Sequence, residues 1–257
     1  LYGNYIYVSS IMMGAFWIAI YLLLIVAYYA GYLYDFKFQS LGRIAVWVLS
    51  LSVLLFLVIA FLFTNNMTLM LSPDKWIRFF SNSGGTLLNM DEGSLIPRLL
   101  HFILASVAVG GLFVALLGKM VTKKDPNLAE KAEKCGMKAF LVFTAIQMGI
   151  GIWFLLALPR ETMMVFMGGN MIATILFGLS LLLSLYLLHT AFKRKVYLTS
   201  ILTVVVVYMM VVMRDFVRSS YLKEFVSLDK LVVQTELLPI ILFGLFLVLG
   251  IATVFWM

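Results

Sequence analysis

Residues 43–64 read RIAVWVLSLSVLLFLVIAFLFT, an apolar stretch whose single charged residue, Arg43, stands at its first position. A helix needs about 20 consecutive apolar residues to cross the hydrocarbon core of a bilayer. The stretch reaches that length, so it predicts a membrane-spanning helix.

Six further apolar runs share the chain with this one. Apolar residues make up 63% of the 257 residues and charged residues only 12%, against about 25% charged residues in an ordinary soluble domain. A soluble globule of this length has too little interior for so much apolar surface. Disordered, collagen-like and disulfide-rich chains are excluded by the same composition. We expect an all-α polytopic transmembrane bundle, one domain over residues 1–257, with helices near 7–33, 43–64, 97–119, 137–158, 163–191, 196–217 and 236–257.

The charged residues predict how the bundle is oriented. The connections after the first, third and fifth runs carry net charges of +1, +3 and +3, which together make the formal charge of +7. Cytoplasmic loops are enriched in Lys and Arg, so these connections are expected inside, the amino terminus outside and the carboxyl terminus inside. The alternate connections sum to zero: residues 74–98, 160–161 and 214–236. Because the lysines are split among short loops, nucleic-acid binding is not predicted.

The ends and the cysteine content add two expectations. The chain starts at Leu1 and stops at Met257 inside an apolar run, so we expect a sequence that is processed or incomplete at one or both ends. No basic segment precedes the first run, as a signal peptide would require. The single cysteine, Cys135, excludes a disulfide framework and a paired-cysteine haem attachment site.

Polar side chains at membrane depth are costly and so indicate function. His101 lies about one turn into the third predicted helix, and Gln147 lies near the middle of the fourth. Arg214 and Arg218 lie at the outer end of the sixth helix, one turn apart and on one face. His189 adjoins the basic residues 193–195, so it is interpreted as interfacial.

The expected topology brings an imidazole, several thioethers and several guanidinium groups to one depth. Iron in a b-type haem takes an imidazole nitrogen and, on its other face, a thioether. Haem propionates need cations at the membrane surface, and the candidates are Arg98, Arg160, Arg214 and Arg218. Other interpretations stay open: His101 as a hydrogen-bonding residue between helices, the methionines as core filler, and the arginines as interfacial residues.

Two amphipathic stretches, 72–80 and 219–235, are predicted to lie in the membrane interface. Each is interpreted either as a surface cap or as a docking surface or lid. Transport is disfavoured, because the sequence has no internal repeat and no carboxylate at the midplane of a span.

Residues 97–118, PRLLHFILASVAVGGLFVALLG, resemble the haem-ligating helix of the large subunit of cytochrome bd quinol oxidases. Residues 65–73, NNMTLMLSP, are similar to that family's Asn-Gly-Trp-Met-x-x-Pro segment. The resemblance implies that His101 is an axial ligand of a low-spin b haem, with Met171, or next Met167, as its partner.

The chain also departs from the family. Residues 213–219 lack the family's Gly-Arg-Gln-Pro-Trp, the two amino-terminal family helices have no counterpart, and residues 159–162 replace its long quinol-binding loop. The resemblance is therefore to a diverged, shortened relative, and it does not imply oxygen reduction.

These observations predict a membrane subunit of a quinol-linked respiratory electron-transfer complex in a bacterial inner membrane. It would bind one b haem near the outer face, oxidise quinol or menaquinol, and pass electrons to an extrinsic c-type cytochrome or other redox subunit. Further membrane subunits and lipids are the other expected partners. Candidates for the quinol site are Asp215, Trp76 and Glu92. The alternative is a haem-free quinone-binding or structural membrane anchor of a larger complex.

Overall fold

A computed structural model describes residues 3–81, 83–122, 124–226 and 237–256. The contacts divide the chain into two units, Leu1–Leu222 and Lys223–Met257, each of which is described by itself. The described residues form helices and their connections, without strands. The all-α prediction is confirmed.

Among the described residues, seven helices are long and apolar enough to cross a membrane. This number agrees with the prediction, and the chain is an integral membrane protein. The seven helices are α2 (Gly14–Leu41), α3 (Ile44–Met70), α4 (Leu95–Val121), α5 (Pro126–Leu156), α7 (Met171–Phe192), α8 (Val196–Tyr221) and α9 (Leu237–Trp256).

Two predicted spans are interrupted. The first, expected at 7–33, is divided at Met13 into the short helix α1 (Gly3–Met12) and α2. The fifth, expected at 163–191, is divided into α6 (Arg160–Met164), the π-helical turn η2 (Val165–Gly169) and α7. The second break has a local cause, because Gly168 has a φ of +104°, which favours glycine. Asn170 then starts α7, since its side chain accepts a hydrogen bond from the Ala173 backbone N–H.

The fourth span begins eleven residues before the predicted position 137, at Pro126. The Asp125 side chain accepts a hydrogen bond from the Leu128 N–H at 3.0 Å, and proline occupies the first turn. Both features are typical of a helix N-terminus. The lysine-rich stretch is therefore helical and extends α5 beyond the apolar run.

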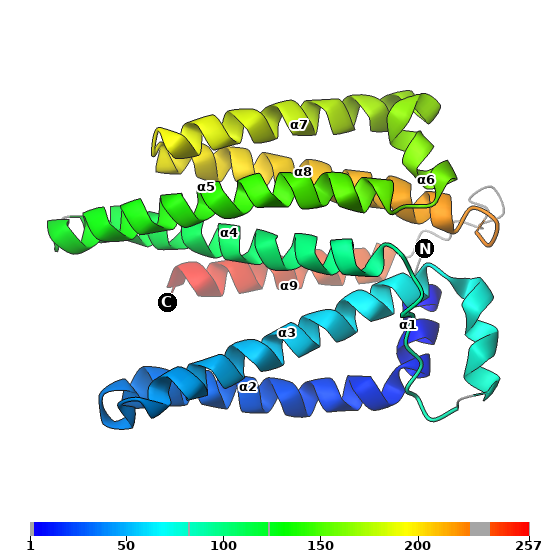
Figure 1. Ribbon diagram of the computed structural model, residues 1–257, viewed down its shortest axis with the longest axis horizontal. Helices are drawn as coiled ribbons and strands as arrows, with labels where there is room; N and C mark the ends of the chain where they lie inside the picture. The colour runs from blue at the N-terminus through cyan, green and yellow to red at the C-terminus, as the bar shows by residue number, and fades with distance from the viewer. Residues whose placement is uncertain (1–2, 82, 123, 227–236, 257) are drawn as a thin grey trace. The chain divides into compact units, whose positions relative to one another are not determined.

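Helices α4 and α5 lie side by side along their length (Figure 1). Three glycines, Gly111, Gly118 and Gly136, allow their backbones to approach closely. A Cβ at Gly111 would lie 2.8 Å from the Gly136 carbonyl oxygen, and one at Gly118 would lie 2.9 Å from the Ala129 oxygen. Small residues serve this purpose in membranes, where van der Waals packing drives helix association.

Side-chain hydrogen bonds also join other helix pairs. Ser52 of α3 donates to the Ala27 carbonyl oxygen of α2 at 2.8 Å, and Thr199 of α8 donates to the Thr190 hydroxyl of α7 at 3.1 Å. Contacts of α8 with α3, with α6 and with the loop before α4 bring together the helix ends near His101. We call this the His101 end and the opposite one the lysine end.

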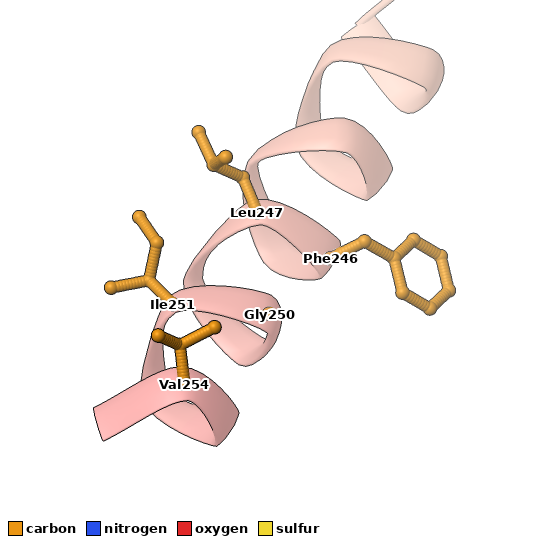
Figure 2. A pocket seen from close by; sticks show the side chains of 5 residues that line it. All are labelled: Phe246, Leu247, Gly250, Ile251 and Val254. Atoms are coloured by element: carbon orange, nitrogen blue, oxygen red, sulfur yellow. The ribbon is translucent and has the colours of Figure 1, made fainter. Parts of the chain in front are cut away.

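The second unit contains α9. Almost all of its described side chains are exposed within the structure. Gly250 leaves a shallow hollow between four apolar side chains (Figure 2), those of Phe246, Leu247, Ile251 and Val254. Such a surface suits acyl chains or other apolar protein surfaces.

We predict that Gly111→Ala weakens the α4–α5 pair, because the new methyl group would overlap the Gly136 carbonyl. The expected cost is about 1–3 kcal/mol of unfolding free energy. The measurement is the thermal unfolding midpoint in detergent. The adjacent Gly110 is the matched control, since a Cβ there meets nothing within 4 Å. An equal loss in Gly110→Ala would contradict the explanation.

Candidate functional site

Asn65, near the end of α3, fixes the loop that leads to α4. Its Oδ1 accepts a hydrogen bond from the Asn89 backbone N–H at 2.9 Å, and both asparagines are buried. The Lys75 ammonium group donates to Asn89 Oδ1 at 2.8 Å, and Asn89 Nδ2 donates to the Ser72 hydroxyl at 3.4 Å. These bonds hold Lys75 beside the start of α4.

The short 3₁₀ helix η1 (Pro73–Ser81) occupies the first segment that was predicted to be amphipathic. Trp76 Nε1 donates to the Leu69 carbonyl oxygen at 2.9 Å, and the Trp76 ring centroid lies 5.7 Å from that of Tyr5. Ile77 and Phe80 are exposed. Trp76 therefore attaches η1 to α1 and α3. Most of the second predicted amphipathic segment, 219–235, lies outside the described residues.

Glu92 is the centre of a polar cluster at the His101 end. Its Oε1 accepts hydrogen bonds from the Ser94 hydroxyl at 2.9 Å and the Tyr221 hydroxyl at 3.3 Å. Its Oε2 lies 3.7 Å from the Lys75 ammonium nitrogen, and its side chain is 14% exposed. We call Lys75, Glu92, Ser94 and Tyr221 the Glu92 cluster. The cluster joins the loop, the start of α4 and the end of α8 around one carboxylate.

Asp91, the neighbour of Glu92, has a different environment. Its carboxylate receives two hydrogen bonds from the Arg78 guanidinium, at 3.3 and 3.0 Å, and it is half exposed. These bonds hold the pKa of Asp91 below its usual value. Asp91 and Arg78 thus form an ion pair on the surface of the loop. Such exposed pairs contribute little to the stability of the fold.

Arg98 lies one turn into α4 and is 7% exposed. Its guanidinium carbon lies 5.2 Å from the ring centroid of Phe154 on α5, a cation–π contact. One terminal nitrogen donates a long hydrogen bond of 3.5 Å to the Ser94 hydroxyl. Within the described part of the chain, its Nε has no hydrogen-bond partner.

His101 faces α5. Its Nε2 lies 3.3 Å from the Gln147 amide nitrogen, and a Cβ at Gly151 would lie 3.5 Å from its Cε1. The Phe154 ring lies beside it, with the two centroids 6.4 Å apart. The Nδ1 atom is buried and finds no hydrogen-bond partner among the described residues. The alternative role of His101, a contact between helices, is thus visible, while one ring nitrogen stays unused.

The methionines predicted as partners of His101 are exposed side chains. Met171, at the start of α7, is 77% exposed, and Met167, in η2, is 54% exposed. The haem ligands expected from the sequence are therefore a partly buried imidazole that contacts α5 and two exposed thioethers. Their role as ligands stays a prediction, and no chemical step is derived through a haem.

Other cationic side chains lie around the His101 end. Arg214 donates to the Met67 thioether sulfur at 3.2 Å. Asp215, a predicted quinol-site residue, is 60% exposed and lies 3.5 Å from Arg218. Arg160, at the start of α6, is exposed. Asp215 is therefore paired at the surface, whereas Glu92 is enclosed.

Sequence reasoning selected Glu92, Arg98 and His101 but missed three members of the Glu92 cluster: Lys75, Ser94 and Tyr221. Tyr221 lies 129 positions from Glu92 in the sequence, and no local pattern links the two. A tyrosine at the interfacial end of a span was the one available signal. Lys75 was read only as part of an amphipathic segment.

Comparison of the chain with protein-family models, with curated proteins and with solved structures found no match. Within the described residues, no group of three or more His, Cys, Asp or Glu side chains is placed to bind a metal ion. The fold and the site thus define an integral membrane protein with an enclosed, hydrogen-bonded carboxylate at one end of its bundle.

We predict that Asn65→Ala loosens the loop before α4, because the Asn89 N–H would stay buried without an acceptor. The expected cost is about 1–3 kcal/mol, with faster proteolysis at residues 72–94. Thermal unfolding and limited proteolysis measure both effects. Asn66→Ala is the control, since Asn66 donates to Ser10 of α1 instead. Equal loop cleavage in both variants would refute this role of Asn65.

Proposed function

We propose that the chain is a quinone-binding membrane subunit of a larger electron-transfer complex, and that quinol binds at the Glu92 cluster. The observation that carries the proposal is the environment of Glu92. Its carboxylate is 14% exposed, accepts two hydroxyl hydrogen bonds, and lies beside a lysine at the start of a transmembrane helix. An enclosed carboxylate is costly unless it is paired and hydrogen-bonded, so these partners support a binding role for Glu92.

The chemistry of quinol oxidation suits this arrangement. Oxidation of a quinol to a quinone releases two electrons and two protons, so the bound hydroxyl groups need a proton acceptor. Glu92 supplies a carboxylate, and the Lys75 ammonium nitrogen lies 3.7 Å from it. The electrons leave to a redox partner, for which we propose an extrinsic c-type cytochrome.

The charge distribution supports the proposed placement. In the described structure the basic connections lie at the lysine end and the Glu92 cluster at the other end. By the positive-inside rule the cluster then faces outward, and protons are released outside. We propose a bacterial inner membrane, other membrane subunits as partners, and a distant relationship to the large subunit of cytochrome bd quinol oxidases.

The test uses the full chain with its co-purifying subunits in lipid nanodiscs and a photoreactive azido-quinone. Glu92→Gln keeps the shape of the side chain and removes its charge. We expect labelling affinity to fall about ten- to a hundredfold, as loss of a charge-assisted hydrogen bond implies. Labelled peptides should map to the loop before α4 and to the end of α8.

Asp91→Asn is the matched control, because it removes the neighbouring charge from an exposed pair. Its labelling should equal that of the wild type. Identical labelling of wild type and Glu92→Gln, or cross-links confined to other helices, would leave a structural anchor as the better description.

A haem-binding subunit is the second candidate, and the unused Nδ1 of His101 favours it. This nitrogen is a possible axial ligand, and bound haem would supply one-electron transfer. The exposed positions of Met171 and Met167 do not support a methionine partner in the same arrangement.

We predict for this candidate a reduced-minus-oxidised spectrum with one b haem per chain. His101→Ala should remove the absorbance bands, whereas His189→Ala should retain them, because His189 lies near the lysine end of α7. Haem quantitation on the solubilised subunit is the measurement. A colourless wild-type chain would rule out the haem and leave the quinone-binding proposal intact.

A further inference from the structure

The lysine end of the bundle carries a row of exposed lysines that the proposed quinone site does not use. Lys131, Lys134 and Lys138 follow one another at intervals of three and four residues along α5, so they lie on one face of the helix. All three side chains are exposed, and among the residues that the structure describes none of them forms an ion pair. We call these three residues the lysine row.

The acidic residues nearby leave the row positively charged. Glu133 of α5 is directed toward α4, where its carboxylate pairs with the Lys119 ammonium group at 2.6 Å. Asp125 is the capping residue of the helix. Glu130 is the other acidic residue of α5, and it is exposed. The row keeps a net positive charge even when Glu130 is counted against it.

A second basic segment lies beside the row. The turn between α7 and α8 consists of the exposed basic residues 193–195. Ala191 and Val196, on either side of this turn, belong to the same buried cluster as Met137 of α5. The turn therefore lies near the part of α5 that carries the lysine row, and the α4–α5 hairpin extends beyond it (Figure 1). Two connections of the bundle thus contribute positive charge to one region.

The length of α5 places the lysine row at the surface of the bilayer. The helix has 31 residues, about 46 Å, against a hydrocarbon core of about 30 Å. Its opposite end is apolar up to Leu156, so the surplus of about 16 Å belongs to the lysine end. Lys138 lies about 18 Å along the axis from Pro126, at the edge of the core. Lys134 then lies in the headgroup layer, and Lys131 lies just above it.

We propose that the lysine row, together with the 193–195 turn, binds the headgroups of anionic phospholipids in the adjoining leaflet. Basic clusters next to a membrane-spanning helix attract anionic lipids electrostatically. A lysine ammonium group is a compact charge on a flexible stem, so lysines at slightly different heights can reach the same layer of phosphate groups.

The continuation of this face toward the membrane centre suits the rest of a lipid molecule. Val142 and Ile146 follow Lys138 by one and two turns, and both are exposed apolar side chains. Acyl chains can pack along such a surface while the headgroup stays with the ammonium groups. The row lies at the opposite end of the bundle from the Glu92 cluster, so this proposal does not depend on quinone binding.

The test titrates phospholipid onto the delipidated full chain, with its co-purifying subunits, and counts lipid adducts by native mass spectrometry. Phosphatidylglycerol should bind more tightly than zwitterionic phosphatidylcholine. Lys134→Gln and Lys138→Gln should each weaken the binding of phosphatidylglycerol about fivefold, the factor that one basic residue near an anionic surface contributes. The triple variant that also carries Lys131→Gln should weaken it about a hundredfold.

Lys37→Gln is the matched control, because it removes one exposed lysine of α2 from the same end of the bundle. Its affinity for phosphatidylglycerol should equal that of the wild type. Equal weakening by Lys37→Gln, or unchanged affinity in the triple variant, would overturn the proposal. Loss of a co-purifying subunit from the triple variant, with phosphatidylglycerol binding unchanged, would assign the row to an acidic protein partner instead of lipid.

Discussion

The close approach of the α4 and α5 backbones is the constraint on which the site depends. At Gly111, Gly118 and Gly136 there is no room for a side chain, so this close approach constrains the rotation and offset of the two helices. That register places the Phe154 ring against the Arg98 guanidinium and the Gln147 amide against His101. The polar groups near one end are thus positioned by apolar contacts that begin more than one turn away.

The Glu92 cluster is positioned differently, by hydrogen bonds of the loop before α4. Asn65 and Asn89 fold the loop onto the end of α3, and the loop delivers Lys75 and Glu92 to the start of α4. Tyr221 completes the cluster from α8. The Ser94 and Tyr221 hydroxyl groups donate hydrogen bonds to the Glu92 carboxylate, and the Lys75 ammonium group lies beside it. Asp91, one residue earlier, meets mostly solvent and forms an ordinary surface pair.

The spans could be predicted because membrane thickness sets the length of an apolar run. Runs of that length can be recognised in the amino-acid sequence itself. It did not predict where helices end in polar sequence, since α5 begins at the capping residue Asp125, well before its apolar run. The break at Gly168 and Asn170 was also missed, because its cause is a single backbone conformation.

Depth along a span selected His101 in the sequence, whereas Arg98 was selected as a cation at the membrane surface and Glu92 as a candidate proton acceptor. Depth does not reveal which side chains meet, because the rotation of a helix about its axis decides whether a side chain contacts a neighbour. That rotation follows from packing between distant segments, which a single sequence does not display. The same reason explains why Tyr221 was overlooked.

The connection between α4 and α5 is short, at residues 122–125. Helices joined by a short loop lose little chain entropy when they pair, so this hairpin forms early during synthesis. The bond between Tyr221 and Glu92 has to wait until α8 has entered the membrane. Biogenesis is thus ordered: the rigid scaffold is made first, and the polar cluster closes only when the last helix of the larger unit arrives. A chain interrupted before α8 would carry the scaffold with its carboxylate still unpartnered by tyrosine.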